Sequence, residues 1–267
     1  MAKLEISSDD FALHSGYRLL QDRGTVGVLD ADDLVATPEG REVAWDDDAF
    51  VTARRAYVRE KIVQPAQRLA AALAPTLRLG CAADPVYRTE RKPQAEQRAA
   101  AVRRVAESDD LPNALRAEAL HAMASLQSYV ASTDWDAKLI LKAVESIHRS
   151  VALDPSSASA WTDYGATGLL VARRGVFARW YVRSNTGIDA DEVIKRSIDK
   201  LKDFPQDPRA QVILQQLIEQ TGRHEDLLRT VCARLETMRQ DPAKAAIIAA
   251  ARAEMVARQQ DVEGCEK

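Results

Sequence analysis

Arginine and aromatic side chains alternate in the stretch RRGVFARWYVR, which spans residues 173–183. Guanidinium groups pair with carboxylates and phosphates and stack on aromatic rings, so this mixture suits an anion, a nucleic acid or a peptide carboxylate. In the competing interpretation, Phe177 and Tyr181 pack into the core at helical spacing while the arginines face water. The sequence favours this packing, which leaves Trp180 as the exposed aromatic. The candidate partner-binding residues are Arg173, Arg174, Arg179, Trp180 and Arg183.

Motifs that mark catalytic or metal sites are missing from the sequence. It contains no GxSxG, GxxxxGK[ST], HExxH or GxGxxG pattern. The histidines fall in separate predicted elements without ligand spacing and are His14, His121, His148 and His224. The cysteines are odd in number and far apart, which argues against a disulfide framework, and are Cys81, Cys232 and Cys265. We therefore predict a protein that is not an enzyme and that needs no cofactor or metal.

The composition favours helices and argues against a nucleic-acid partner. Of the 267 residues, 46% are hydrophobic and 29% charged, which is typical of a globular chain with a real core. Alanine, leucine, arginine, glutamate and glutamine lose little side-chain freedom in helices, so a mostly helical protein is expected. The net charge of −3 lacks the basic footprint that nucleic-acid binding needs.

Charge is distributed unevenly along the first hundred residues. Residues 1–50 contain 12 acidic and 4 basic side chains, whereas residues 51–104 contain 12 basic and 4 acidic ones. We expect these two stretches to pair with each other or to face water. The first residues, MAKLEISSDDF, do not resemble a signal peptide, and no run of about 18 apolar residues could span a membrane. We expect a cytoplasmic protein whose membrane contacts, if any, are peripheral.

The N-terminal region combines a helix with short β-like segments. A helix is expected over 8–23, followed by strands at 26–29, 34–37 and 42–45 with a turn at Pro38–Gly40. The segment RLLQDRGTVGVLDADDLVATPEGREVAW resembles the end of a recognition helix and the wing of a winged-helix domain, and TVGVLDADDLVAT resembles the opening strands of a PAS-like sensor. Only one predicted helix precedes the hairpin, and the acidic charge would repel phosphate. A capping or docking region is the favoured interpretation.

Helices are expected throughout the rest of the chain. The first runs over 49–74 with a kink at Pro65, a loop spans 80–93, and a helix over 94–107 precedes a break at 108–112. Further on, a turn is expected at 132–134 and helices at 113–131, 135–152, 157–173, 176–184, 190–203, 209–221, 223–239 and 243–260. These boundaries suggest an N-terminal part at 1–48, a helical connector at 49–112, paired helices at 113–260 and a tail at 261–267.

The spacing of helix stops in the paired region is regular. Asp-Pro dipeptides close helices at Pro155, Pro208 and Pro242. The last two prolines are 34 residues apart, which is the period of the tetratricopeptide repeat. The first gap is 53 residues, one period plus 19, which leaves room for one extra helix.

The sequence from 113 to 260 resembles the tetratricopeptide family. In SVALDPSSASAWTDYGATGLL, a small residue and a proline end one repeat, and a large, large, small pattern opens the next. In ILQQLIEQTGRHEDLL, a turn glycine separates two helices of a pair. The matching positions are Ser150, Pro155, Trp161, Tyr164, Gly165, Gly222 and Pro242. On this alignment the small position in the partner helix of Trp161 falls at or near Phe177.

The resemblance implies an all-α fold of stacked antiparallel helix pairs with a small N-terminal hairpin region. It also implies a function in holding a partner peptide or helix in a groove, as an adaptor, chaperone or assembly subunit. Two alternatives stay open: a regulator that uses the N-terminal region, and an auxiliary subunit of envelope or polysaccharide machinery. The expected partner is another protein or a peptide.

Overall fold

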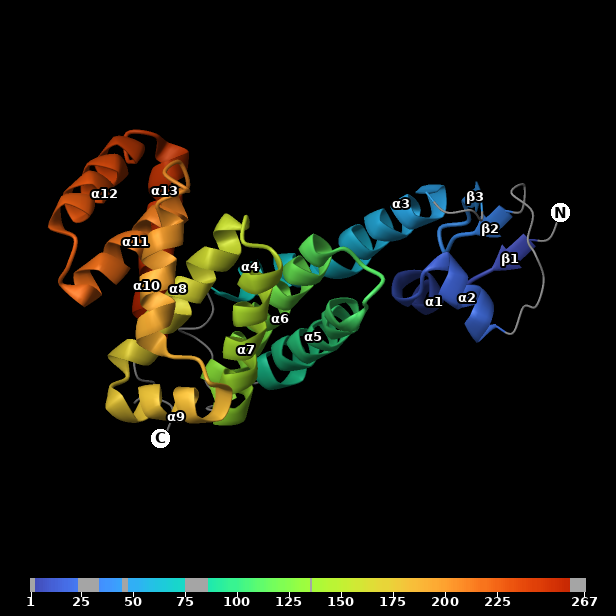
Figure 1. Ribbon diagram of the computed structural model, residues 1–267, viewed down its shortest axis with the longest axis horizontal. Coiled ribbons are helices and arrows are strands. Elements are labelled where there is room, and N and C mark those ends of the chain that lie inside the picture. Colours follow the sequence, from blue (N-terminus) through green and yellow to red (C-terminus); the bar gives the residue numbers. More distant parts are fainter. Residues whose placement is uncertain (1–2, 24–33, 45–47, 75–85, 135, 260–267) are drawn as a thin grey trace.

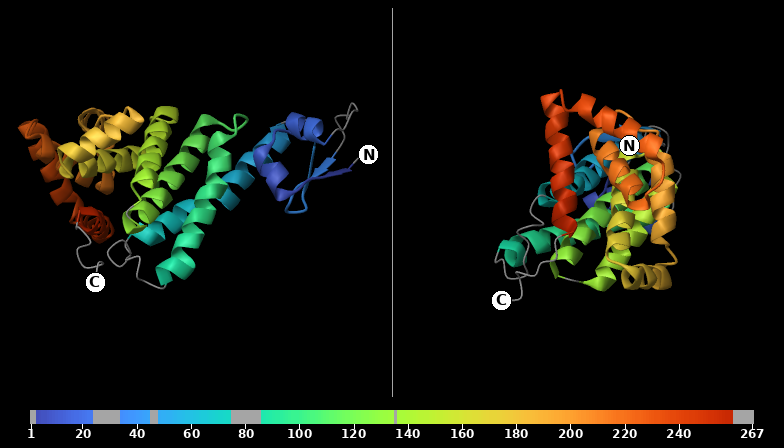
Figure 2. Two further views of the ribbon diagram at one scale, coloured as in Figure 1. Left: turned by 90° about the horizontal axis from the view of Figure 1, so that it is seen from below. Right: turned by 90° about the vertical axis from the view of Figure 1, so that its left-hand side faces the viewer.

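The computed structural model describes residues 3–23, 34–44, 48–74, 86–134 and 136–259, most of them in helices. The molecule is elongated (Figure 1), with a small N-terminal module at one end and helices of the C-terminal part at the other. Two further views (Figure 2) show the helices of residues 92–153 lying side by side in the middle of the molecule. Among the described residues, no helix has the length and apolar character needed to cross a membrane.

The N-terminal module contains a three-stranded sheet and two short helices. Strands β2 (Leu34–Ala36) and β3 (Glu42–Ala44) form the predicted antiparallel hairpin, and the unpredicted β1 (Lys3–Glu5) pairs in parallel with β2. Its core consists of Ile6, Phe11, Leu19, Val35 and Phe50. The strand predicted at 26–29 lies outside the described residues.

The single helix predicted over 8–23 is wrong, because the structure has two. Helix α1 (Ser8–Leu13) ends at His14, whose backbone is extended, and α2 (Gly16–Asp22) begins after Ser15. The Ser15 hydroxyl accepts a hydrogen bond from the main-chain N–H of Arg18, which supplies a new N-cap. Two helices therefore precede the hairpin where the sequence suggested one.

Two prolines are accommodated by π-helical turns. Helix α3 (Asp48–Tyr57) passes into η1 (Val58–Val63) and then α4 (Gln64–Leu73), with Pro65 in the first turn of α4. In the same way η3 (Tyr87–Arg91) precedes α5 (Lys92–Glu107), which has Pro93 in its first turn. A proline cannot donate to the preceding turn, and the wider π turn accommodates that loss. The loop predicted up to residue 93 is therefore wrong from Tyr87 onward.

The remaining helices follow the predicted pattern closely. They are α6 (Asn113–Asp134), α7 (Ala137–Leu153), α8 (Ala158–Arg173), α9 (Val176–Thr186), α10 (Ala190–Leu201), α11 (Pro208–Thr221), α12 (Glu225–Met238) and α13 (Pro242–Gln259). Side chains of Asp136, Ser157, Asp189 and Asp207 cap four of these helices.

The turn predicted at 132–134 is wrong, because α6 continues to Asp134. The Asp134 carboxylate accepts hydrogen bonds from Lys92 Nζ at 2.6 Å and from the Tyr87 hydroxyl at 2.9 Å. Both donors come from the segment that begins α5. These long-range contacts extend α6 past the point where its local sequence favours a turn.

Helix α8 pairs with α10 rather than with α9, which corrects the alignment that placed Phe177 opposite Trp161. A Cβ built on Gly165 would lie 3.1 Å from Ser197 Cβ, and one on Gly168 would lie 2.6 Å from Val193 Cγ1. The contact that lies later in α8, at Gly168, is made to the residue that lies earlier in α10, Val193, so the two helices are antiparallel. Ser197, which is fully buried, faces Gly165 across this contact. Helix α9 lies in the chain between the two helices that contact each other.

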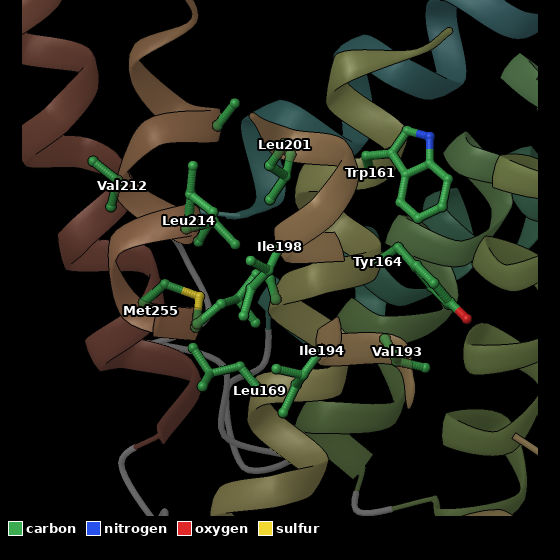
Figure 3. Packing of buried hydrophobic residues seen from close by; sticks show 14 of the residues in the cluster. Trp161, Tyr164, Leu169, Val193, Ile194, Ile198, Leu201, Val212, Leu214 and Met255 are labelled. Carbon is green, nitrogen blue, oxygen red and sulfur yellow. The ribbon is translucent and has the colours of Figure 1, made fainter. Parts of the chain in front are cut away.

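The largest core lies where α8, α10, α11 and α13 meet (Figure 3). Trp161 and Tyr164 are buried there with ring centroids 5.6 Å apart, and the Trp161 indole N–H donates to the carbonyl of Pro155 at 2.9 Å. Ser150 is buried and donates to the Ala117 carbonyl at 2.8 Å, which joins α7 to α6. Gly222 ends α11 in a left-handed conformation, and Pro242 begins α13.

Replacing Gly168 with alanine should destabilise the protein. Alanine gains about 1 kcal/mol of helix propensity over glycine, but overpacking against Val193 costs about 1–3 kcal/mol. Because the added Cβ would lie only 2.6 Å from Val193 Cγ1, we place the cost in the upper part of that range, at about 2–3 kcal/mol. We therefore expect a net loss of about 1–2 kcal/mol in the free energy of unfolding, measured by urea denaturation. The Gly168→Ala change should cost less in a Val193→Ala background, because the 2.6 Å contact with Cγ1 is then gone and only the 3.1 Å contact with Cβ remains. A Gly168→Ala variant as stable as the wild type would contradict the close approach of α8 and α10.

Candidate functional site

A polar cavity, here called the inner cavity, lies among helices α4, α6, α8, α11 and α13. Its volume is about 330 Å³. Its lining is dominated by small and polar side chains and consists of Gln67, Ala70, Ala71, Ala74, His121, Ala122, Ser125, Ser128, Tyr129, Ser132, Ser159, Asp163, Arg209 and Glu254. Helices α6, α8 and α11 pack against α7, α10 and α12, respectively. The cavity thus combines one helix of each of these packed pairs with α4 and α13.

Four charged or titratable side chains form one network in this cavity. The Asp163 carboxylate lies 2.8 Å from His121 Nε2 and accepts a hydrogen bond from Arg209 Nη2 at 2.9 Å. The same Arg209 nitrogen lies 3.1 Å from a Glu254 carboxylate oxygen. Each side chain comes from a different helix, namely α6, α8, α11 and α13. The network, here called the charged clamp, therefore ties four helices together.

Electrostatics explain why the charged clamp is stable despite its partial burial. The side chains of Asp163 and Glu254 are 14% and 15% exposed. Their negative charges flank the guanidinium, and the Coulomb attraction of Asp163 raises the pKa of Arg209 above its ordinary value. Ser125 and the imidazole of His121 do not form a nucleophile–base pair, because the Ser125 hydroxyl donates instead to the main-chain carbonyl of His121 at 3.1 Å.

A second cavity, here called the outer cavity, lies between α5, α7 and the start of α10, with a volume of about 480 Å³. Its charged lining is balanced, with basic Arg103, Lys142, Arg149 and Arg196 opposite acidic Glu107, Glu145, Asp189 and Glu192. At its floor His148 Nδ1 lies 2.8 Å from the Tyr164 hydroxyl. The formal charges of the lining therefore sum to zero, with histidine taken as neutral.

The predicted arginine–aromatic residues are brought together on α9, and their burial differs from the expectation. Trp180 is exposed, as predicted, but Phe177 and Tyr181 are exposed as well, so the prediction that they pack into the core is wrong. The reason is that α10 takes the place beside α8, which leaves only Val182 of α9 buried. The aromatics therefore stay on the surface with the arginines.

Those arginines make contacts at the periphery of the helix pair. Arg179 forms two 3.0 Å hydrogen bonds with the Asp191 carboxylate, and Arg183 lies 3.1 Å from Asp189. Arg173 donates to the side chain of Gln220 at 3.3 Å. Arg174 likewise is not without a partner. All these candidate residues lie outside the linings of the inner and outer cavities.

The charged clamp is the part of the site that sequence reasoning missed. Its neighbours are separated by 42, 46 and 45 residues along the chain. Histidines were considered only for ligand spacing among themselves, which cannot reveal contacts between helices. The nearly equal separations of His121, Asp163, Arg209 and Glu254 are the signal that could have found them. No cluster of three or more candidate metal ligands occurs within the described ranges.

Removing the Arg209 guanidinium should destabilise the protein, because two partly buried carboxylates then lose their shared cation. We expect Arg209→Met to lower the free energy of unfolding by about 1–3 kcal/mol, after allowing for solvent screening of a partly exposed site. Adding Glu254→Gln should restore part of the loss. The matched control is Arg252→Met on α13, which loses only a hydrogen bond to the uncharged Gln215. Equal losses in both variants would contradict the charged clamp.

His148 should make stability depend on pH. Burial, helped by the nearby Arg196 charge, lowers the pKa of His148 below its ordinary 6.5. Below pH 6.5 the unfolded chain binds a proton that the folded chain does not, so stability should fall as the pH drops through that region. Thermal melts of His148→Gln should show a shallower fall than the wild type between about pH 7.5 and 5.5. Tyr164→Phe should keep the steep fall, because burial is the main cause. Identical slopes for His148→Gln and the wild type would overturn this assignment.

Comparison with known proteins gives no match: no family model, curated protein or solved structure is significantly similar to this chain. The function is therefore argued from the two cavities, the charged clamp and the exposed surface of α9.

Proposed function

We propose that this protein is a non-enzymatic interaction module that holds a peptide segment of a partner protein in the inner cavity. The observation that carries the proposal is the composition of that cavity, which combines side chains of α4, α6, α8, α11 and α13. In arrays of helix pairs, the first helices line a continuous surface that suits an extended or helical peptide.

The chemistry of the lining suits a peptide better than a reaction. Alanines at 70, 71 and 122 let a ligand backbone approach closely, and serines at 125, 128 and 132 offer hydroxyl groups for main-chain hydrogen bonds. The volume of about 330 Å³ is within the range of ligand sites, so it would take the side chains of a short segment. The side chains of the charged clamp contact one another, which favours a role for this network in shaping the cavity.

The tetratricopeptide resemblance supports the same proposal. The close approach of α8 to α10 at Gly165 and Ser197 is a contact between two small residues, and the small positions of the family pattern would serve such an approach. The 19 residues beyond one period are taken up by α9 and its connections. We accordingly propose a divergent tetratricopeptide-like array with one inserted helix, acting as an adaptor, chaperone or assembly subunit.

A photoreactive amino acid placed in the inner cavity tests this function. Ser132 is exposed within the lining, so a photoreactive side chain there should crosslink to a bound partner in cells without disturbing the core. The matched control position is Ala233, on the exposed side of α12. We expect a specific adduct, identified by mass spectrometry, from position 132 and none from position 233.

Blocking the cavity should then weaken binding of that partner. Ser128→Trp fills space in the lining, and we expect it to raise the Kd by about tenfold or more, equivalent to about 1.4 kcal/mol. Ala233→Trp should leave the Kd unchanged. An adduct at both positions, or a Kd that Ser128→Trp does not change, would remove the inner cavity as the binding site.

A further inference from the structure

Helix α9 lies on the outside of the helical stack, against the ends of α7 and α8. Figures 1 and 2 both place it at the periphery of the molecule. Val182 is its one buried residue, and a glycine with positive φ lies just beyond each end, Gly175 and Gly187. The helix is therefore a separate surface element, inserted between the partners α8 and α10.

Its outward side carries a continuous apolar surface, here called the α9 face. The exposed fractions are 79% for Val176, 87% for Phe177, 65% for Trp180 and 36% for Tyr181. At about 100° per residue these four side chains occupy an arc of roughly 140°, on the side of the helix away from Val182. Four of the nine exposed large hydrophobic residues in the described ranges belong to this one short helix. Such concentration on a surface marks a contact site.

Positive charge surrounds the α9 face. Residues 173–186 contain four arginines and no acidic residue, in a chain whose net charge is −3. The pairs Arg179–Asp191 and Arg183–Asp189 lie at the surface, where ion pairs contribute little to stability. Arg179 also donates to the main-chain carbonyl of Ala172 at 3.3 and 3.4 Å, which holds its guanidinium beside the end of α8. The excess of arginines favours an occupant that offers negative charge next to an apolar region.

A second copy of the chain does not meet this requirement. Two α9 faces packed together would bring two sets of four arginines close to one another, with only the paired Asp189 and Asp191 of each copy to offset them, and like charges at an interface are costly. Residues 176–181 also line neither the inner nor the outer cavity. The α9 face is a protruding helical surface rather than a groove.

An anionic lipid surface meets each condition. Tryptophan, tyrosine and phenylalanine are favoured at the level of lipid headgroups, and arginines pair with lipid phosphates while their stems contact the apolar boundary. A deformable bilayer accepts a protruding helix without a complementary cavity. We propose that α9 is an interfacial helix that inserts Phe177 and Trp180 among the headgroups of an anionic membrane. This role is separate from the proposed peptide binding, because α9 contributes nothing to the inner cavity.

Co-sedimentation with lipid vesicles tests the proposal on the full chain. The probes are vesicles of phosphatidylcholine alone and of phosphatidylcholine with about 30% phosphatidylglycerol. We expect the wild type to sediment with the anionic vesicles, to bind the neutral ones at least about tenfold more weakly, and to be released by about 0.5 M NaCl. Phe177→Ser/Trp180→Ser should lower the partition coefficient on anionic vesicles by at least about tenfold.

Two controls separate lipid binding from other effects. Tyr17→Ser removes an equally exposed aromatic of the N-terminal module and should sediment like the wild type. The double variant should melt at the wild-type temperature, because its changed side chains are exposed. Fluorescence of Trp180, obtained as the difference between wild type and Trp180→Phe, should shift to shorter wavelength on anionic vesicles.

Several results would overturn the proposal. They are a wild type that stays in solution with anionic vesicles, equal binding to neutral vesicles, or a double variant that sediments like the wild type. Wild-type dimers seen by analytical ultracentrifugation and lost in the double variant, without vesicle binding, would assign the α9 face to a second copy instead. Crosslinking from position 132 reports contact at the inner cavity, to which α9 contributes no residue, so its outcome is read separately from vesicle binding.

Discussion

The close approach of α8 and α10 is the constraint on which the rest of the helical array depends. Gly168 has no side chain where a Cβ would lie 2.6 Å from Val193, and Gly165 faces the buried Ser197. Two helices can come this near only where small residues line the contact. Once α10 occupies that position, α9 has no place in the stack, and its aromatic side chains stay in contact with water. One packing choice thus creates both the main core and the exposed helix.

The charged clamp connects four helices, whereas the glycine contact connects two. Arg209 connects α8 and α13 through its two carboxylate partners, and His121 adds α6 through the same Asp163. Partly buried ion pairs contribute little net stability but are costly to break, so they specify one arrangement among several apolar ones. The clamp can fix the relative positions of four helices whose apolar contacts alone would allow some sliding. A cavity with a fixed shape is what selective peptide binding requires.

Local signals predicted the helices well, because they act within a few residues. Helices were expected to begin at 157, 190 and 209, and the structure begins them within one residue of those positions, after the capping residues Ser157, Asp189 and Asp207. Gly222 ends α11 as expected. Errors arose where a distant contact decides the outcome. Asp134 stays helical through Lys92 and Tyr87, and Phe177 is exposed because α10 displaces its helix. The charged clamp was likewise invisible to local reasoning, since its members lie in four separate helices.

The junction between the N-terminal module and the helical array also depends on contacts between residues far apart in the sequence. Arg54 of α3 is buried, and its burial lowers the pKa to about 10, so the side chain remains charged at neutral pH. It donates to the Ser108 hydroxyl at 3.4 Å, and that hydroxyl donates to the Leu13 carbonyl at 3.2 Å. Burying this charge opposes docking, which therefore depends on apolar contacts such as those of Tyr57, a member of both neighbouring clusters.

Such a junction is specified by individual polar partners rather than by a repeating apolar stripe. Apolar periodicity reports which face of a helix is buried, and it is strong in the array from α6 onward. It says nothing about a single arginine that meets a serine 54 residues away. The same physical difference explains why the helices of the array were predicted closely, whereas β1 and the break between α1 and α2 were missed in the N-terminal module.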